Sequence, residues 1–400
     1  MATSAPLRRR LDYAGPALFS YGFRPFFLGG ALWAILALAL WLPQYAGLFS
    51  LPTALTPLDW HIHEMLYGYV AAVVAGFMLT AISNWTGRLP ISGWPLAALF
   101  GLWAAGRVVM LVSSWTGLPV AASVDVLFLV ALAAVAAREI VAGRNWRNLR
   151  VLVVLCMLIA GNIVFQAELL TSGVADWGIR LGVAATIMLI MLIGGRIVPS
   201  FTRNWLARRV PGRLPAPFSR FDGTALAGSA AALIGWVAVP ESRMVAGLML
   251  VAALLQTIRL ARWAGERTFA DRLVLVLHVA YAFIPLGFAL VGASILWPDL
   301  MPRSAGIHTW TAGAIGMMPL AVMTRASLGH TGQALAATAG TQAIYACALL
   351  GALARILASV TASKTLMDVA ALGWIVAFAG FAILYGPLLV RRPPVWANRC

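Results

Sequence analysis

Long apolar stretches alternate with short polar segments along the whole chain. Each stretch is about 20 residues long, which is the length at which an α-helix crosses ~30 Å of hydrocarbon. The pattern predicts an all-α polytopic membrane protein with one transmembrane domain over residues 1–400 and about 12 transmembrane helices. The predicted spans are Phe26–Leu42, His63–Ile82, Trp94–Ser113, Val120–Ala137, Val151–Leu170, Trp177–Val198, Phe221–Val239, Met244–Trp263, Leu273–Trp297, Gly306–Thr324, Ala339–Val360 and Met367–Val390.

Composition and charge agree with this prediction. Hydrophobic residues make up 62% of the chain and charged residues only 10%, against about a quarter charged in soluble domains, so the lipid bilayer is the expected surroundings. The net charge of +16 does not indicate a nucleic-acid partner, because the basic residues fall in alternate loops as the positive-inside rule requires. We expect both termini to be cytoplasmic. The following arginine-containing segments then all lie on the cytoplasmic side: Arg8–Arg10, Arg144–Arg150, Arg203–Arg220, Arg259–Arg272 and Arg391–Arg399.

The five histidines are the main candidates for chemistry: His61, His63, His278, His308 and His330. An ionisable side chain at membrane depth is costly and marks a functional site by default, and neutral imidazole binds iron, copper or zinc. The predicted topology divides them into an outer group and an inner group. His61, His63 and His308 form the outer group, and His278 and His330 form the inner group, so at least two polar sites are expected.

The segment from Asp59 to Met65 opens the second predicted helix with an H-x-H motif. Residues two apart on a helix project about 200° from each other, so the rings of His61 and His63 cannot face one way. Either His61 lies in a non-helical entry or each ring serves a different centre, an arrangement similar to the H-x-H helix of haem–copper oxidases. Glu64 shares the face of His61 and is expected to orient that ring or to carry protons. The alternative is a polar helix start with carboxylates near the positive end of the helix dipole.

The inner histidines have structural alternatives as well. A satisfied hydrogen bond in the protein core would explain His278, and a solvated turn would explain His330. Arg325 lies near His330 in the sequence and favours a site, because arginine pairs haem propionates and other anions in bidentate fashion.

Other polar or small residues in or near the spans have less specific interpretations. Glu168 is a candidate for a proton path, and Gly194 and Gly195 precede Arg196 and permit close helix approach. The remaining residues of this kind, for which the sequence predicts no role, are Arg24, Arg107, Asp125, Asn162, Gln166 and Arg180.

Three predicted helices end with similar sequences, at residues 80–88, 196–204 and 324–332. They recur about every four spans, which would divide the chain into three four-helix units, as in haem–copper oxidases. Common helix-end signals are the alternative explanation.

Further motifs lie at Phe23–Phe27, Trp60–Leu66, Gly76–Ala81, Asn84–Gly87, Gly194–Pro199, His308 and Met323–Gly332. Together these stretches resemble the NnrS family of bacterial membrane proteins. The resemblance implies an inner-membrane protein with haem b, one or two per chain, and with copper as a possible second metal. It also implies a link to nitric oxide metabolism and to protection from nitrosative stress during denitrification. Many relatives have Phe-His where this chain has Phe165-Gln166, so a ligand role there does not transfer.

The expected function is that of a haem-dependent oxidoreductase of the nitric oxide reductase type, which binds nitric oxide and reduces it to nitrous oxide. The expected metal ligands are His61, His63 and His308, with His278, His330, Arg325 and Arg196 as further cofactor-binding residues. Glu64 is the expected catalytic proton donor and quinol the expected electron donor. The alternatives are a proton-coupled secondary transporter and a non-catalytic haem sensor or store of nitric oxide.

Overall fold

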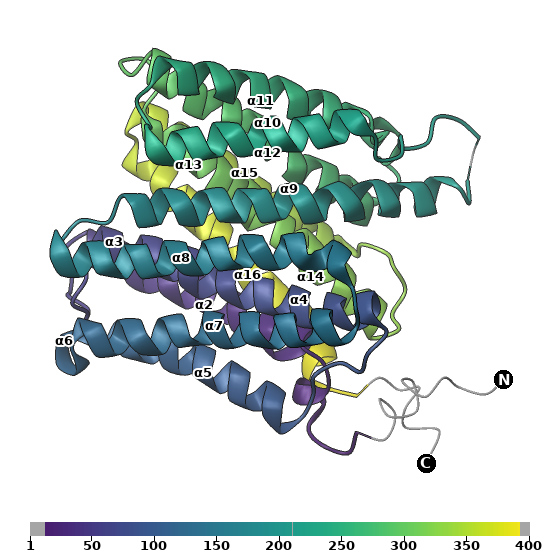
Figure 1. The fold of residues 1–400 in the computed structure, drawn as a ribbon, viewed down its shortest axis with the longest axis horizontal. Helices are drawn as coiled ribbons and strands as arrows, with labels where there is room; N and C mark the ends of the chain where they lie inside the picture. Colours follow the sequence, from purple (N-terminus) through teal and green to yellow (C-terminus); the bar gives the residue numbers. More distant parts are fainter. Residues whose placement is uncertain (1–12, 210, 393–400) are drawn as a thin grey trace. The chain divides into compact units, whose positions relative to one another are not determined.

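The computed structural model describes residues 13–209 and 211–392, and these residues form helices and connecting loops without a strand (Figure 1). Eleven helices in the described ranges are long and apolar enough to cross a membrane. The predicted all-α polytopic fold is therefore confirmed. Arg8–Arg10 and Arg399, which contributed to the charge pattern, lie outside the described residues.

The elements in chain order are η1 (Ala17–Ser20), α2 (Phe23–Tyr45), α3 (Pro57–His63), η2 (Glu64–Tyr69), α4 (Val70–Thr86), α5 (Trp94–Leu111), α6 (Ser113–Thr116), α7 (Leu118–Ala142), η3 (Trp146–Asn148), α8 (Leu149–Thr171), α9 (Trp177–Leu206), α10 (Arg220–Ala238), α11 (Arg243–Ala261), η4 (Gly265–Arg267), α12 (Arg272–Leu296), α13 (Arg303–His308), η5 (Thr309–Ile315), α14 (Gly316–His330), α15 (Ala339–Thr361) and α16 (Lys364–Val390).

Two of the predicted spans are helical throughout but contain a π-helical segment. The predicted span His63–Ile82 lies within Pro57–Thr86, which runs through α3, η2 and α4. The predicted span Gly306–Thr324 lies within residues 303–330, which run through α13, η5 and α14. The second run is not among the eleven candidate spans, and this accounts for the difference from the twelve predicted. In both runs the π-helical segment directly follows a histidine, and such segments occur frequently at functional sites.

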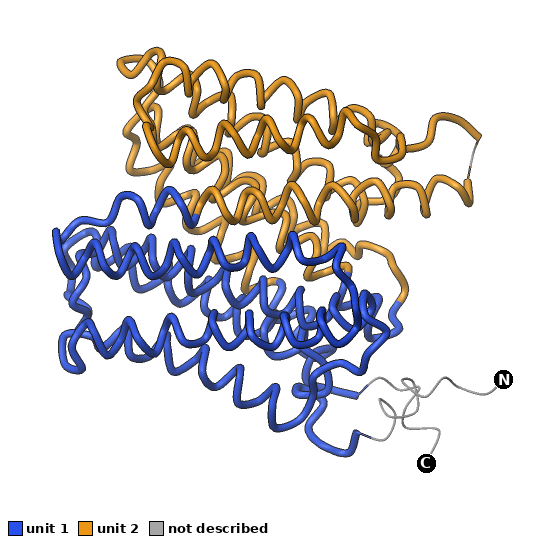
Figure 2. The backbone as a smooth tube through the Cα atoms, in the orientation of Figure 1, with its two compact units in different colours: residues 1–182, 326–333, 381–400 blue, residues 183–325, 334–380 orange. Residues whose placement is uncertain are grey.

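The chain divides into two compact units (Figure 2). Unit 1 comprises residues 1–182, 326–333 and 381–400, and unit 2 comprises residues 183–325 and 334–380. Whether the chain also contains three repeats of four helices stays a prediction.

In unit 1, helix α2 packs on α3, η2 and α4, while α7 packs on α4, α5 and α8. The start of α3 follows from its sequence. The hydroxyl of Thr56 accepts a hydrogen bond from the backbone N–H of Asp59, and Pro57 occupies the first turn, where its missing N–H costs nothing. This cap fixes the place where the H-x-H motif enters the helix.

In unit 2, helix α12 packs on α11, α13 and η5, and α15 packs on α13 and η5. Side chains set the helix starts here too. Ser219 and Asp222 form a capping box at α10, and the carboxylate of Asp271 accepts from two backbone N–H groups at α12.

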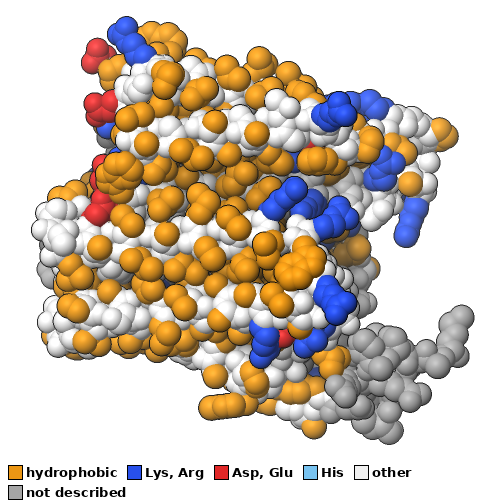
Figure 3. Space-filling model, viewed as in Figure 1, with side chains coloured by type: hydrophobic (Ala, Val, Ile, Leu, Met, Phe, Trp, Pro, Cys, Tyr) orange, Lys and Arg blue, Asp and Glu red, His pale blue; other side chains and the backbone are white. Residues whose placement is uncertain are grey.

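Charged side chains gather at the helix ends of each unit. On the face shown in Figure 3, most basic side chains of unit 2 lie at the end that carries the α9–α10 and α11–α12 connections, and acidic ones lie at the opposite end. In unit 1 the basic side chains lie mainly at the end with the α4–α5 and α7–α8 connections. This asymmetry is typical of a membrane protein.

Candidate functional site

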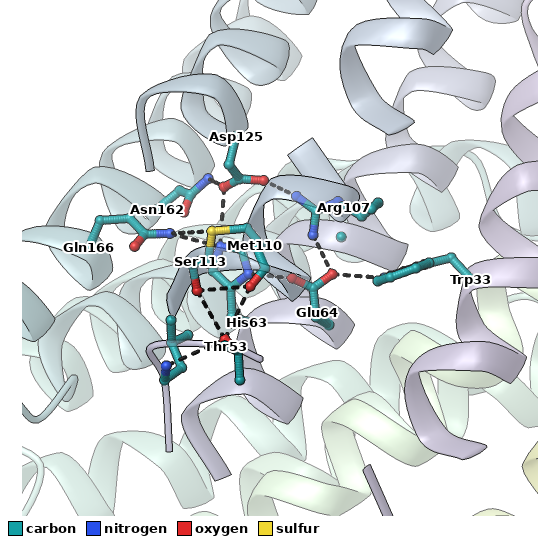
Figure 4. Close-up of polar contacts among 12 residues, drawn as sticks. Trp33, Thr53, His63, Glu64, Arg107, Met110, Ser113, Asp125, Asn162 and Gln166 are labelled. Atoms are coloured by element: carbon teal, nitrogen blue, oxygen red, sulfur yellow. Dashed lines mark hydrogen bonds and ion pairs between the residues drawn. The ribbon is translucent and has the colours of Figure 1, made fainter. Parts of the chain in front are cut away.

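A buried polar network lies in unit 1 where five helical runs converge (Figure 4). We call it the His63 network. Its titratable side chains are almost fully buried: His63 and Glu64 are 0% exposed, Asp125 2% and Arg107 3%. Its members are Trp33 of α2, His63 of α3, Glu64 of η2, Arg107 and Met110 of α5, Asp125 of α7, and Asn162 and Gln166 of α8.

Arg107 joins the two carboxylates of the network. Its Nη1 donates to Oε2 of Glu64 at 2.5 Å, and its Nη2 donates to Oδ1 of Asp125. The remaining acceptor positions are also used, because Trp33 Nε1 donates to Oε2 of Glu64 at 2.8 Å and Asn162 Nδ2 donates to Oδ2 of Asp125 at 2.7 Å. Charged groups this deeply buried are stable only when paired and hydrogen-bonded in this way.

The imidazole of His63 lies between the same two carboxylates. Nδ1 is 2.9 Å from Oε1 of Glu64, and Nε2 is 3.1 Å from Oδ2 of Asp125. The ring is further enclosed by Phe165 and Tyr67, with ring centroids 5.3 and 5.6 Å away. Each ring nitrogen therefore faces a carboxylate oxygen, and Nε2 also faces the amide nitrogen of Gln166.

The charges of the network balance only if it holds one additional proton. Two carboxylates and one guanidinium leave one negative charge, and an imidazolium at His63 would neutralise it. The same balance results if the ring is neutral and one carboxyl group carries the proton. Hydrogen bonds of ordinary length join His63 to both carboxylates, and a shift of the proton among these three side chains would not change the net charge.

The π-helical segment η2 allows this close packing. A Cβ atom added at Gly68 would lie 2.5 Å from Nη1 of Arg107 and 2.8 Å from Oε2 of Glu64. Only glycine leaves room for the ion pair at this position. The backbone carbonyl of Gly68 also accepts from Nε1 of Trp103 at 3.0 Å.

Sequence reasoning identified only part of the network. His63 and Glu64 were predicted, whereas Arg107, Asp125 and Asn162 were noted without a role. Gln166 occupies the position where a ligand role does not transfer, and its Nε2 lies 3.0 Å from Nε2 of His63. The signal that could have found them was their polarity within apolar spans.

The other predicted residues of unit 1 lie in different surroundings. The ring of His61 stacks on Trp41 with centroids 4.0 Å apart, so the H-x-H motif sends its two rings to different neighbours. Spacing placed Glu64 on the face of His61, but its carboxylate binds the ring of His63. The ring of His330 packs against the rings of Tyr21 and Phe23, with centroid distances of 5.5 and 5.3 Å.

Glu168 caps a helix. Its carboxylate accepts hydrogen bonds from the backbone N–H groups of Asp176, Trp177 and Gly178 at the start of α9. These are the donors that a helix leaves unsatisfied at its N-terminus. These hydrogen bonds explain why a carboxylate is present at position 168, and no proton path has to be invoked.

In unit 2, the hydrogen bonds within the described part of the chain engage one ring nitrogen of His308 and one of His278. Nδ1 of His308 donates to the carbonyl of Ser304 at 2.7 Å. Thr202 donates its hydroxyl proton to Val198 and lies 2.8 Å from Nε2 of His278, so this Nε2 carries the hydrogen. Nδ1 of His278 is buried and has no partner among the described residues.

The two predicted arginines belong to helices α14 and α9. The guanidinium of Arg325 lies 4.3 Å from the ring centroid of Phe201, and its Nη1 is buried without a hydrogen-bond partner in the described part of the chain. Arg196 follows Gly194 and Gly195 in α9. A Cβ at Gly195 would collide with the guanidinium of Arg259, and a Cβ at Gly194 would lie 3.3 Å from ring atoms of Tyr281.

Whether these residues fit a metal or a haem depends on their free donor atoms. Residues 13–209 and 211–392 contain no cluster of three or more His, Cys, Asp or Glu side chains arranged to hold a metal ion. Both nitrogens of His63 are engaged, so His63 would have to break a contact to bind metal. His308 and His278 fit the role of single histidine ligands, since each offers a lone pair while the other nitrogen is anchored. The predicted metal set of His61, His63 and His308 stays a prediction.

The comparisons with known proteins give one match. The model of the NnrS family, described as NnrS protein, matches residues 17–392. No curated protein and no solved structure matches the chain significantly. Because the family model covers nearly the whole sequence, including both interrupted helices and all five histidines, the chain belongs to the NnrS family.

Proposed function

We propose that this protein is a haem-dependent membrane redox protein that binds nitric oxide and reduces it to nitrous oxide, which would protect the cell from nitrosative stress. Membership of a family linked to the response to nitric oxide supports the substrate. The His63 network supports the proton chemistry, and it is the observation on which the proposal depends. A quinol is the proposed electron donor.

The overall reaction consumes protons. Two nitric oxide molecules, two electrons and two protons give one nitrous oxide and one water: an N–N bond forms, an N–O bond breaks, and the released oxygen leaves as water. Haem, when bound, would supply a coordination position for nitric oxide and a path for the electrons. The protons must travel through a region of low dielectric constant, where only a built set of polar side chains can hold them.

Glu64 and His63 would hold and transfer the proton in this scheme. Their hydrogen bond of 2.9 Å lets the proton move from one side chain to the other over a short distance. Arg107 and Asp125 act as positioning residues: Arg107 fixes both carboxylates, and Asp125 holds the second nitrogen of the ring. The His63 network would thus be neutral in the resting state, and it would donate one proton to the reaction when nitric oxide is reduced.

A proton-coupled transporter is the second candidate. The same network could couple proton movement to a solute, and helices interrupted in their middle are common at transporter binding sites. The π-helical segments Glu64–Tyr69 and Thr309–Ile315 interrupt two of the helical runs.

Spectroscopy of the full chain separates these functions. The protein, purified in detergent from haem-sufficient cells, should show a Soret band that shifts with nitric oxide, and with a quinol it should form one nitrous oxide per two nitric oxide consumed. Absence of a Soret band would contradict the proposal, and proton-coupled solute uptake by the same protein in vesicles would establish the transporter. A Soret shift without turnover would indicate a sensor or store.

The predicted metal ligands need a separate test. Haem content and nitric oxide consumption should be measured for His61→Ala, His63→Ala and His308→Ala. We expect a loss in at least one variant. If all three keep full haem content and activity, these residues do not form the metal site.

A further inference from the structure

One end of unit 2 carries the α9–α10 and α11–α12 connections, and basic side chains gather there (Figure 3). Some of these arginines hold the two connections together. Arg203 donates to the backbone carbonyl of Pro215, Arg213 pairs with Glu266 at 2.6 Å, and Arg267 donates to the carbonyl of Arg213. Their contacts fasten one connection to the other, so the local structure accounts for these three arginines.

Four further arginines at this end have no such partner. All four are exposed, and the described part of the chain gives their guanidinium groups neither an ion pair nor a hydrogen bond. One of them, Arg209, lies 4.8 Å from the ring centroid of Trp205. The four residues are Arg208 and Arg209 after α9, Arg220 at the start of α10 and Arg272 at the start of α12.

The carboxylates at this end are already engaged. Asp222 pairs with Arg259 at 3.3 Å, and Glu266 pairs with Arg213. Asp271 accepts hydrogen bonds from the backbone at the start of α12. Among the described residues of this end, no carboxylate is therefore left to balance the four exposed arginines, and their combined positive charge attracts an anion.

Exposed aromatic side chains accompany the four arginines. Phe218 lies two residues before Arg220 and is 64% exposed, and Phe269 lies three residues before Arg272 and is 61% exposed. A phenyl ring is stabilised when it leaves water for hydrocarbon, and aromatic and basic residues occur together at the level of lipid headgroups. The positive-inside rule explains arginines at this end, but it does not explain the exposed phenylalanines.

We propose that this surface binds the headgroup of an anionic phospholipid. We call it the basic patch, and its residues are Arg208, Arg209, Phe218, Arg220, Phe269 and Arg272. Guanidinium groups pair with phosphate oxygens in bidentate fashion, while the phenyl rings enter the adjoining hydrocarbon. A soluble polyanion matches the charge but provides no hydrocarbon for the rings. The inference does not depend on the proposed function.

Equilibrium binding of fluorescent phosphatidylglycerol to the full-length protein in detergent tests the basic patch. Phosphatidylcholine with the same acyl chains is the neutral probe, and the wild type should bind it at least tenfold more weakly. Removal of one arginine should weaken binding of phosphatidylglycerol about fivefold. We therefore expect a loss of about 25-fold in each of two double variants, Arg208→Gln with Arg209→Gln and Arg220→Gln with Arg272→Gln.

The matched control makes the same change of charge at the opposite end of unit 2. Arg243 begins α11 and Arg303 begins α13, and both are exposed. The double variant Arg243→Gln with Arg303→Gln should bind phosphatidylglycerol as tightly as the wild type. Phe218→Ser with Phe269→Ser should weaken binding of both lipids, because the rings contact hydrocarbon and not the headgroup.

Three results would overturn the inference. One is equal affinity of the wild type for the two lipids. Another is a pair of basic-patch double variants that bind phosphatidylglycerol as the control variant does. The third is displacement of the lipid by soluble glycerol phosphate at a similar concentration, which would show that the surface recognises phosphate without the lipid.

The wild type alone decides the question if a double variant does not fold. Binding of phosphatidylglycerol through exposed arginines should weaken about tenfold between about 0.05 and 0.5 M sodium chloride, because salt screens exposed charges. Binding that does not change with salt would contradict the role of the arginines.

Discussion

Nη1 of Arg107 donates to Oε2 of Glu64 at 2.5 Å, and both side chains are almost fully buried in unit 1. The same guanidinium holds Asp125 with its other terminal nitrogen. One cation thus stabilises two carboxylates, and the ring of His63 lies between them.

Removal of that cation should be strongly destabilising. In Arg107→Gln, Glu64 and Asp125 would remain buried without their counter-charge, and loss of one partner of a buried ion pair costs about 3–5 kcal/mol. Unfolding of the purified variant in detergent, followed by circular dichroism, measures the loss. Arg303→Gln is the control, since its exposed pair with Glu241 should contribute about 0–1 kcal/mol. Equal stability of the two variants would contradict the charge balance described above.

Restoring the charge balance of the His63 network should recover part of the stability lost in Arg107→Gln. The double variant Arg107→Gln with Asp125→Asn removes one charge of each sign, so it should be more stable than Arg107→Gln alone. The same unfolding experiment compares the two proteins. A double variant that is less stable than the single one would show that Asp125 is not held as an anion.

A methyl group at Gly195 should disturb a second buried cluster, in unit 2. Arg259 donates to the carbonyl of Met191 and to the hydroxyl of Tyr281, and a Cβ at Gly195 would collide with its guanidinium. We expect Gly195→Ala to cost about 1–3 kcal/mol of folding free energy. Gly247→Ala is the control, because no atom lies within 4 Å of that added Cβ, and it should be neutral or up to about 1 kcal/mol stabilising. A Gly195→Ala variant as stable as the wild type would contradict the close packing of Arg259 on Gly195.

Glu168 should matter for stability and not for turnover. Glu168→Ala removes the acceptor for three backbone N–H groups of α9, and loss of a helix cap costs about 0.5–2 kcal/mol. Nitric oxide consumption per folded molecule should equal that of the wild type. A specific loss of turnover with unchanged stability would instead place Glu168 on a proton path.

The apolar runs allowed prediction of the helices because each run has the length of a membrane crossing. Of the predicted spans, only Gly306–Thr324 is not among the candidate membrane spans of the described residues. The site was harder to predict. His63 and Glu64 are adjacent and form an evident motif, whereas Arg107, Asp125 and Asn162 come from three other helices that meet only in the folded chain. The spacing of residues within one helix placed Glu64 on the face of His61. That spacing contains no information about Arg107 of α5, whose guanidinium binds the carboxylate of Glu64 beside His63.

The rate of nitrous oxide formation by Glu64→Gln tests the central claim most directly. Glu241→Gln makes the same chemical change at an exposed carboxylate and is the matched control. With equal haem content and the same quinol, we predict that Glu64→Gln is slower by about 10²–10⁴-fold, the usual contribution of a positioned proton donor, while Glu241→Gln keeps the wild-type rate. A Glu64→Gln variant that forms nitrous oxide at the wild-type rate would contradict the proposed role of the His63 network.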